Sequence, residues 1–315
     1  MELIRGIDAL SGATERSAVT IGFFDGVHRG HQAVFRTTVR AAGTHRLRPV
    51  AVTFDRHPRE ILTPGEEPKL LTTLERKADL IARLGIDVLV VLEFTEDFST
   101  WPPAEFVQRV LVDGLLARHV VVGSNFTFGH RAAGNLATLA DLGATCGYAV
   151  EGVPLLEIEG RPVSSSSIRE TLAAGDLGWP AEALGRRFVL DGLVTAGAGR
   201  GAGLGYPTAN LEVTPSMLIP GQGVYAGTAI VTGREHAAAV NVGTNPTFGG
   251  EALHVEVFLL DFEGDVRGEP IAVEFWQRLR DEAKFDSAEA LAKQIAQDVE
   301  RTRAAVRIGS PGSVR

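Results

Sequence analysis

Residues 22–31 read Gly22-Phe23-Phe24-Asp25-Gly26-Val27-His28-Arg29-Gly30-His31, which places two histidines on a glycine-rich turn. The apolar run at residues 18–21 predicts a strand before this turn, and helical spacing predicts a helix that begins near His31. The turn is therefore expected at the carboxyl end of a strand, where α/β sheets bind ligands. Glycines admit a ligand close to the backbone, and helix amino termini favour anions. The turn therefore predicts a phosphate site with candidate ligands Gly22, Phe23, Asp25, Gly26 and Gly30.

His28 and His31 are the candidate catalytic residues of this turn. Imidazoles can donate hydrogen bonds to phosphate oxygens while charge moves onto a leaving pyrophosphate, and neither ring then has to act as a base. Two alternatives stay open, namely ordinary surface-loop histidines and half of a zinc site. The zinc alternative is the weaker one, because the chain has one cysteine and shows no second ligand cluster.

The same ten residues resemble the His-x-Gly-His signature of the nucleotidyltransferase superfamily, and the Phe-Asp-Gly-Val-His form at residues 24–28 resembles its flavin adenylyltransferase branch. The resemblance implies that both histidines bind ATP phosphates. It also implies that they stabilise the pentacovalent transition state at the α-phosphorus.

Length and composition limit the classes of protein that this chain can represent. With 315 residues and 44% hydrophobic content, the chain is expected to form two domains. A net charge of -8, a sequence pI near 5.6 and the lack of a basic run argue against a nucleic-acid partner. No signal peptide and no apolar run of about 20 residues is found, so we expect a cytoplasmic protein without a membrane partner. The oligomeric state stays open, weak self-association included.

Cys146 is the single cysteine, so an intramolecular disulfide is excluded. It lies in a helical pattern, where we expect it to serve as a small buried apolar residue.

Residues 1–183 alternate between strand and helix patterns, which predicts a Rossmann-like domain with a parallel sheet covered on both faces. The expected strands lie near residues 18–24, 49–54, 86–92, 118–123 and 148–156. Residues 88–92 and 120–122 are almost continuously apolar, so they should be buried on both sides.

Two further strands end in polar and aromatic residues at the expected ligand-binding edge. Each of these loops could be an ordinary turn, but together they suit a planar ring with amide-like edges. The candidate flavin ligands are Phe54, His57 and Pro58 after one strand and Asn125 and Phe128 after the other.

The run Val163-Ser164-Ser165-Ser166-Ser167-Ile168-Arg169 comes before a short helical pattern. One serine is expected to cap this helix, and the other hydroxyls and the guanidinium could bind phosphate. The run resembles the Ser-Ser-Thr-x-Ile-Arg motif of the nucleotidyltransferases, with Ser166 in place of threonine. The resemblance implies that Ser164, Ser165, Ser166 and Arg169 bind the triphosphate opposite the histidines, whereas a surface salt bridge is the alternative for Arg169.

The pattern changes near residue 184, where short strands separated by glycine, proline and asparagine predict an all-β second domain, a barrel, over residues 184–306. Its last element is a helix, for which Asp286-Ser287-Ala288-Glu289 supplies a capping pattern. Residues 307–315 should be a disordered tail.

Two segments of this second domain carry polar residues that a plain barrel does not need. Gly199, Gly201 and Gly205 belong to a glycine-rich loop that could bind phosphate or could be a floppy connection. Thr208 and Asn210 follow on one face of an extended segment, and their oxygens suit magnesium.

Glu256 lies in the strand pattern 254–261, on a face that it shares with apolar residues. Such a carboxylate is either paired in the core or placed at a barrel mouth for proton transfer, with a structural salt bridge as the alternative to a chemical role.

These segments make the second domain resemble a riboflavin kinase, through Leu204-Gly205-Tyr206-Pro207-Thr208-Ala209-Asn210-Leu211, residues 241–248 and residues 255–257. The resemblance implies that Thr208 and Asn210 hold magnesium-ATP and that Glu256 takes the proton from the ribityl 5'-hydroxyl. Two departures from the family pattern are Ala202-Gly203, where a basic or polar pair is common, and Tyr206 in place of phenylalanine.

The whole chain is therefore similar to prokaryotic FAD synthetases, which implies an enzyme that phosphorylates riboflavin to FMN with ATP and then adenylylates FMN to FAD with release of pyrophosphate. The implied substrates and products are ATP, riboflavin, FMN and FAD, and the implied cofactor is Mg²⁺. Two rivals stay open. One is an adenylyltransferase for another metabolite, and the other is a flavin-binding regulator without catalysis.

Overall fold

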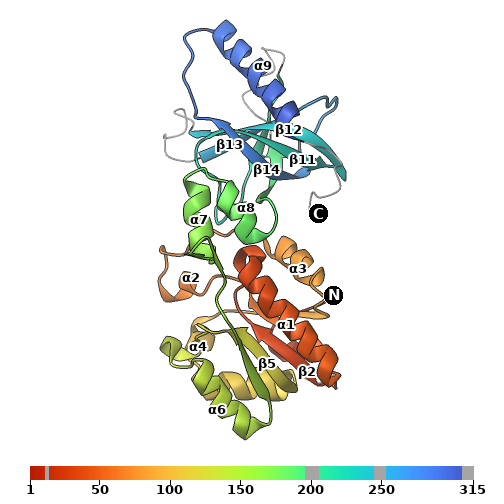
Figure 1. Ribbon diagram of the computed structural model, residues 1–315, viewed down its shortest axis with the longest axis vertical. Helices are drawn as coiled ribbons and strands as arrows, with labels where there is room; N and C mark the ends of the chain where they lie inside the picture. Colours follow the sequence, from red (N-terminus) through yellow and green to blue (C-terminus); the bar gives the residue numbers. More distant parts are fainter. Residues whose placement is uncertain (11–13, 196–205, 245–252, 307–315) are drawn as a thin grey trace. The chain divides into compact units, whose positions relative to one another are not determined.

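The computed structural model describes residues 1–10, 14–195, 206–244 and 253–306 (Figure 1). The chain divides into two compact units. The first consists of Met1–Pro68 and Thr73–Ser164, and the second consists of Lys69–Thr72 and Ser165–Arg315. The short segment Lys69–Thr72 belongs to the second unit because Leu70 forms a parallel bridge with Met217.

The first unit contains a six-stranded parallel sheet in the order β1-β4-β3-β2-β5-β6. Its strands are β1 (Glu2–Arg5), β2 (Ser17–Ile21), β3 (Arg48–Phe54), β4 (Val88–Leu92), β5 (Ala117–Gly123) and β6 (Ala149–Val153). All of β4 and residues 120–122 of β5 are buried, which confirms the expectation from their continuous apolar runs. The edge strand β1 was not predicted.

Helices cover both faces of this sheet, as expected for a Rossmann-like domain (Figure 1). One face packs against α5, η3 and α6, and the other packs against α1 and α3. The longer helical elements are α1 (Arg29–His45), α3 (Leu74–Ala82), η3 (Val107–Gly114) and α6 (Leu136–Cys146). The shorter elements are η1 (Asp8–Leu10), η2 (Asp25–Val27), α2 (Arg59–Leu62), α4 (Glu96–Ser99), α5 (Pro103–Phe106), η4 (His130–Ala132), β7 (Glu157–Ile158) and β8 (Arg161–Pro162).

The strand order places the predicted turn next to the switch point of the sheet, where the direction in which the chain adds strands reverses. From β2 the chain proceeds outward through β3 and β4, and β5 then lies on the other side of β2. In open parallel sheets the crevice beyond the carboxyl ends of two such strands is the ligand site. Residues 22–31 follow β2 and residues 124–129 follow β5, so the topology brings these two loops to one edge.

The second unit contains a closed barrel in the order β10-β13-β12-β11-β14-β9. Its strands are β9 (Val189–Thr195), β10 (Ala209–Glu212), β11 (Gly223–Val231), β12 (Arg234–Thr244), β13 (Leu253–Leu259) and β14 (Pro270–Arg280), and its helices are α7 (Ser165–Ala173), α8 (Gly178–Leu184) and α9 (Ala288–Ala305). The barrel and its final helix were both predicted.

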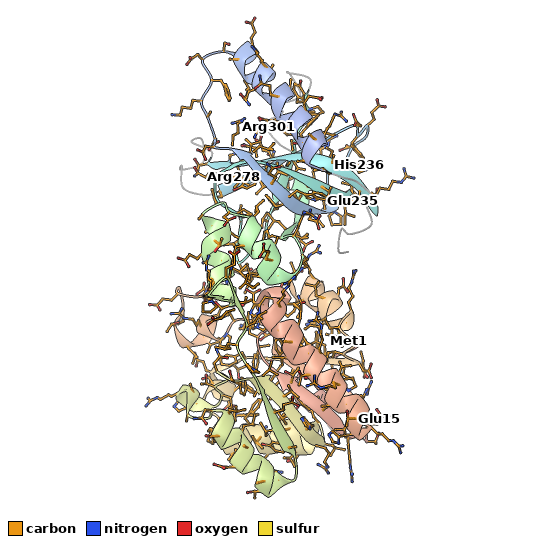
Figure 2. All side chains as sticks on the ribbon, in the orientation of Figure 1. Met1, Glu15, Glu235, His236, Arg278 and Arg301 are labelled. Atoms are coloured by element: carbon orange, nitrogen blue, oxygen red, sulfur yellow. The ribbon has the colours of Figure 1, made fainter. Side chains whose placement is uncertain are left out.

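Helix α9 packs on the outer face of the barrel, where its Val299 lies in an apolar cluster with residues of β11 and β12. Ser287 caps the helix by accepting a hydrogen bond from the backbone N–H of Ala290, as the sequence predicted. Arg301, on the same helix, donates a hydrogen bond to the carbonyl of Leu279 at 2.8 Å (Figure 2).

One expectation about burial is corrected by the structure. Cys146, the last residue of α6, is partly exposed, because it lies in the final turn of a helix of which only one side packs on the sheet.

Among the described residues, no helix combines the length and apolarity that crossing a membrane requires. The predicted tail, residues 307–315, lies outside the described residues.

Candidate functional site

The turn after β2 has an unusual backbone. Phe24, Gly26 and Val27 all have positive φ angles, of 56°, 78° and 44°. This conformation costs a β-branched residue such as Val27 about 1–3 kcal/mol, and such strain persists only where surrounding contacts enforce it. Gly22 is needed at the start of the turn, because a Cβ atom there would lie 2.8 Å from the Phe24 ring.

His28 and His31 are stacked at the beginning of α1, with ring centroids 3.5 Å apart and an angle of 21° between the ring planes. The backbone N–H of His31 donates to Nδ1 of His28 at 3.3 Å, so His28 caps the helix and a neutral His28 carries its proton on Nε2. Gly30 makes this packing compact, since a Cβ atom there would lie 3.1 Å from the His28 ring.

Burial holds the pKa of His31 well below 6.5, and the nearby His28 and Lys77 lower it further. His31 is therefore neutral at neutral pH. Its Nδ1 is buried and has no hydrogen-bond partner within the described part of the chain. A buried polar atom without a partner is costly, and a phosphate oxygen or a water molecule would satisfy it. This arrangement supports hydrogen bonding to an anion and gives no support to general-base catalysis.

Asp25 and Phe23, two of the predicted phosphate ligands, have buried or packed side chains. The Asp25 side chain is 2% exposed, and its charge acts on the ammonium group of Lys77. The ring of Phe23 contacts His57 edge-on at 4.8 Å. Phosphate binding by Phe23, Asp25 and Gly26 stays a prediction.

The predicted flavin ligands lie around an aromatic cluster at the carboxyl ends of β3, β4 and β5. Phe54, the last residue of β3, contacts the rings of Phe94 and Phe98 at 5.5 and 5.8 Å. Phe128 is 8% exposed and packs between Phe106 and Phe126, whereas Asn125 is exposed. Pro58 is the residue before α2. Their role in flavin binding stays a prediction.

Four further aromatic residues of this cluster were missed by the sequence analysis. Phe94 and Phe98 follow β4, Trp101 contacts Phe98 at 4.9 Å, and Phe106 bridges Phe98 and Phe128. The signal that could have found them is the density of aromatic residues directly after a buried strand, in residues 94–106.

The serine run lies at the start of α7, with Ser164 as the last residue of the first unit and Ser165 in the second. Helix α7 begins at Ser165, so Ser164 precedes it and Ser166 and Arg169 lie within its first turns. Ser164, Ser165 and Arg169 all take part in polar interactions. Whether these residues bind phosphate stays a prediction.

In the barrel, three polar residues of separate strands lie in one row. Asn210 of β10 and Asn241 of β12 are the register partners of Glu256 on the strand between them, β13. Side chains of register partners in antiparallel strands lie on the same face of the sheet, with Cβ atoms about 4.5–5.5 Å apart. The neighbours on the opposite face are buried inside the barrel, namely Leu211, Val242, Val255 and Val257.

Glu256 is not a fully buried core residue, because its side chain is 37% exposed. Nε2 of His254 lies 3.9 Å from its carboxylate. Glu256 therefore lies on the outer face of the barrel, together with Asn210, and Thr208 is two residues before Asn210. The described residues contain no cluster of three or more His, Cys, Asp or Glu side chains that could hold a metal ion. The predicted phosphate-loop residues Gly199, Gly201 and Gly205 lie outside the described residues.

Comparison with known families agrees with this division of the chain. Residues 11–167 match the FAD synthetase family model, and residues 184–306 match the riboflavin kinase family model. The chain belongs to the bifunctional riboflavin kinase/FMN adenylyltransferase family. Its two enzymatic domains occur in the order that the motifs predicted.

Relatives in this family match almost the whole chain. The bifunctional riboflavin kinase/FMN adenylyltransferase of Pseudomonas fluorescens is 38% identical, covering 96% of this chain and 97% of that protein. The Listeria monocytogenes enzyme of the same name is also 38% identical, covering 91% of each chain. A crystal structure described as a macrolide-efflux protein from Streptococcus pneumoniae has a TM-score of 0.88 and 31% identity, covering 96% of this chain and 99% of that one.

Proposed function

We propose that the barrel domain, residues 184–306, transfers the γ-phosphoryl group of ATP to riboflavin, and that the sheet domain, residues 1–183, transfers AMP from a second ATP to the FMN produced. The observation that supports this most strongly is the pairing of Asn210 with Glu256 on the outer face of the barrel. A catalytic base and a metal ligand on adjacent strands are what transfer to a hydroxyl group requires.

In the kinase step, Glu256 accepts the proton of the riboflavin 5'-hydroxyl. The 5'-oxygen of riboflavin attacks the γ-phosphorus of ATP, and ADP leaves. The partly exposed carboxylate is accessible to such a substrate. Thr208 and Asn210 would hold Mg²⁺, since their hydroxyl and amide oxygens are the hard ligands that this ion prefers. When bound, the ion neutralises charge on the triphosphate.

In the adenylyl transfer step, a phosphate oxygen of FMN attacks the α-phosphorus of ATP and pyrophosphate leaves. The nucleophile is already an anion, so no base is needed, in agreement with histidines that serve as hydrogen-bond donors. His28 can donate from Nε2 because its Nδ1 already accepts a hydrogen bond. The aromatic cluster around Phe54 would provide the flavin surface.

The same proposal includes phosphate contacts of Ser164, Ser165, Ser166, Arg169 and the glycine loop. It also includes a cytoplasmic location and small-molecule partners, with weak self-association left open. The net charge of -8 supports the exclusion of nucleic acid.

The test is to incubate the full-length protein with riboflavin, ATP and Mg²⁺ and to separate the flavins by chromatography over time. We expect FMN first and FAD afterwards. FMN without FAD would reject the assignment of the sheet domain, and flavin binding without conversion would favour a regulator.

His31→Ala should abolish FAD formation while FMN accumulates, and Asn210→Ala should abolish FMN formation while added FMN is still adenylylated. Loss of both activities in either folded variant would contradict independent sites.

A further inference from the structure

A buried lysine lies directly beneath the turn that carries the two histidines. Lys77 of α3 is 3% exposed, and its ammonium group donates a hydrogen bond of 2.9 Å to the carbonyl oxygen of Phe23. The hydroxyl of Thr53, on β3, donates to the same oxygen at 3.0 Å. The Lys77 ammonium also lies 4.1 Å from the centroid of the Phe23 ring. Lysine is almost never buried unless it is paired, so this position requires an explanation.

The negative partner of this lysine comes from the same turn. Asp25, which is 2% exposed, raises the pKa of Lys77, whereas burial has the larger effect and lowers that pKa from 10.5 to about 8. Lys77 therefore binds the turn through the carbonyl of residue 23, and the charge of Asp25 acts on its ammonium group from the same turn. The bound carbonyl directly precedes Phe24, the first of the residues with positive φ.

Stability of the fold alone does not explain a buried charge here. Replacing a buried ion pair with apolar residues of similar size is often neutral or stabilising, so such a pair is weak evidence of a purely structural role. The strained conformation at Phe24 and Val27, by contrast, needs contacts that enforce it. The His28 and His31 rings lie immediately beyond this strained segment.

We propose that Lys77 is a positioning residue for adenylyl transfer, in which its buried ammonium holds the carbonyl of Phe23 and so fixes the turn that presents His28 and His31. This inference rests on the proposed role of the turn in FMN adenylylation. Lys77 touches no substrate and acts through the backbone of the turn.

The pH dependence of adenylylation distinguishes this role from simple packing. The titratable groups that face the Lys77 ammonium are Asp25 on the turn and His31 on α1, with His28 stacked on His31. Deprotonation of Lys77 weakens its hydrogen bond to the carbonyl and removes its attraction to the charge of Asp25, so wild-type adenylylation should decline as pH rises through about 8. In Lys77→Arg the guanidinium stays protonated over this range, so its activity should extend to higher pH.

The experiment uses the full-length protein and compares wild type, Lys77→Met, Lys77→Arg and the matched control Lys293→Met, whose lysine is exposed on α9. Adenylylation of added FMN and phosphorylation of riboflavin are measured on each sample from pH 7 to 9.5. Lys77→Met should lower kcat/KM for adenylylation about 10- to 100-fold, the usual effect of losing a charged hydrogen bond. Riboflavin phosphorylation should stay within about twofold, and Lys293→Met should change neither activity.

An unchanged kcat/KM in Lys77→Met would overturn the proposal, as would a Lys77→Arg enzyme with the same alkaline decline as wild type. If both Lys77 variants fail to fold, Asp25→Asn decides the question, because loss of the carboxylate lowers the pKa of Lys77 and should move the alkaline decline to lower pH. An unmoved decline would reject the positioning role. A wild-type enzyme that adenylylates no FMN would instead refute the proposed function on which this inference rests.

Discussion

Asn210 on β10 lies directly opposite Glu256 on β13, so an amide and a carboxylate from distant parts of the sequence share one face of the barrel. The same row continues to Asn241 on β12. The pairing depends on the barrel topology, because β11 and β12 lie between β10 and β13 in the sequence and β13 then pairs with β10. A polar site is thereby built on rigid strands instead of loops.

Glu256→Gln should lower kcat for riboflavin phosphorylation by about 10²- to 10⁴-fold, because the amide keeps the shape of the side chain but cannot accept the proton. Adenylylation of added FMN should be unchanged. Glu212→Gln is the matched control, since Glu212 is exposed on β10 and has no assigned role. A phosphorylation rate in Glu256→Gln close to that of the control would show that Glu256 is not the base.

The strands of the sheet were predictable where both faces of a strand are buried. All five residues of β4 are apolar and at most 2% exposed, so its composition alone marks it as a central strand. β1 was missed for the opposite reason. It has four residues at the edge of the sheet, and its Leu3 is 43% exposed, so it shows neither a continuous apolar run nor a buried alternation.

His28, His31, Asn210 and Glu256 were each predicted as site residues from a local motif, whereas the buried position of Lys77 was not predicted. Leu74, Ala78 and Ile81 form the apolar side of α3, and position 77 falls on the same side. A lysine within such a stripe was the available signal. Its partners at Phe23 and Thr53 come from other strands and turns, so they follow from tertiary structure alone.

Asp298→Ala should destabilise the barrel domain by about 3 kcal/mol, because it leaves the guanidinium of Arg280 without its partner. The Asp298 carboxylate is nearly buried and accepts hydrogen bonds from Nε and Nη2 of Arg280 at 3.0 and 2.8 Å, which joins α9 to β14. The measurement is denaturant unfolding followed by the fluorescence of Trp276, in a background where Trp101 and Trp179 are phenylalanine.

The control for this prediction is Asp261→Ala, which breaks the exposed ion pair between Asp261 and Arg303. Exposed pairs contribute little, so the midpoint of unfolding should hardly move. Equal effects of the two substitutions would show that the Arg280 and Asp298 pair does not hold α9.

Gly134→Ala should weaken FMN binding by roughly tenfold, because a Cβ atom at residue 134 would lie 2.7 Å from the ring of Phe128 and overpacking displaces a side chain. The effect should appear as a higher KM for FMN in adenylylation. Gly43→Ala is the matched control, since a Cβ atom there meets nothing within 4 Å. An unchanged KM in Gly134→Ala would count against Phe128 as a flavin ligand.

The free energy of unfolding of the sheet domain should fall as pH drops below 6.5, because the pKa of His31 is lowered in the folded state by burial, by His28 and by Lys77. In this range the unfolded chain binds a proton that the native state does not, so the stability contributed by neutral His31 is complete above pH 6.5 and is lost toward the lower native pKa. For one proton the slope is at most about 1.4 kcal/mol per pH unit. Unfolding is followed by Trp101 fluorescence in a background where Trp179 and Trp276 are phenylalanine. It should show this slope when residue 31 is histidine and a smaller one in His31→Gln, and parallel curves for the two proteins would contradict the lowered pKa of His31.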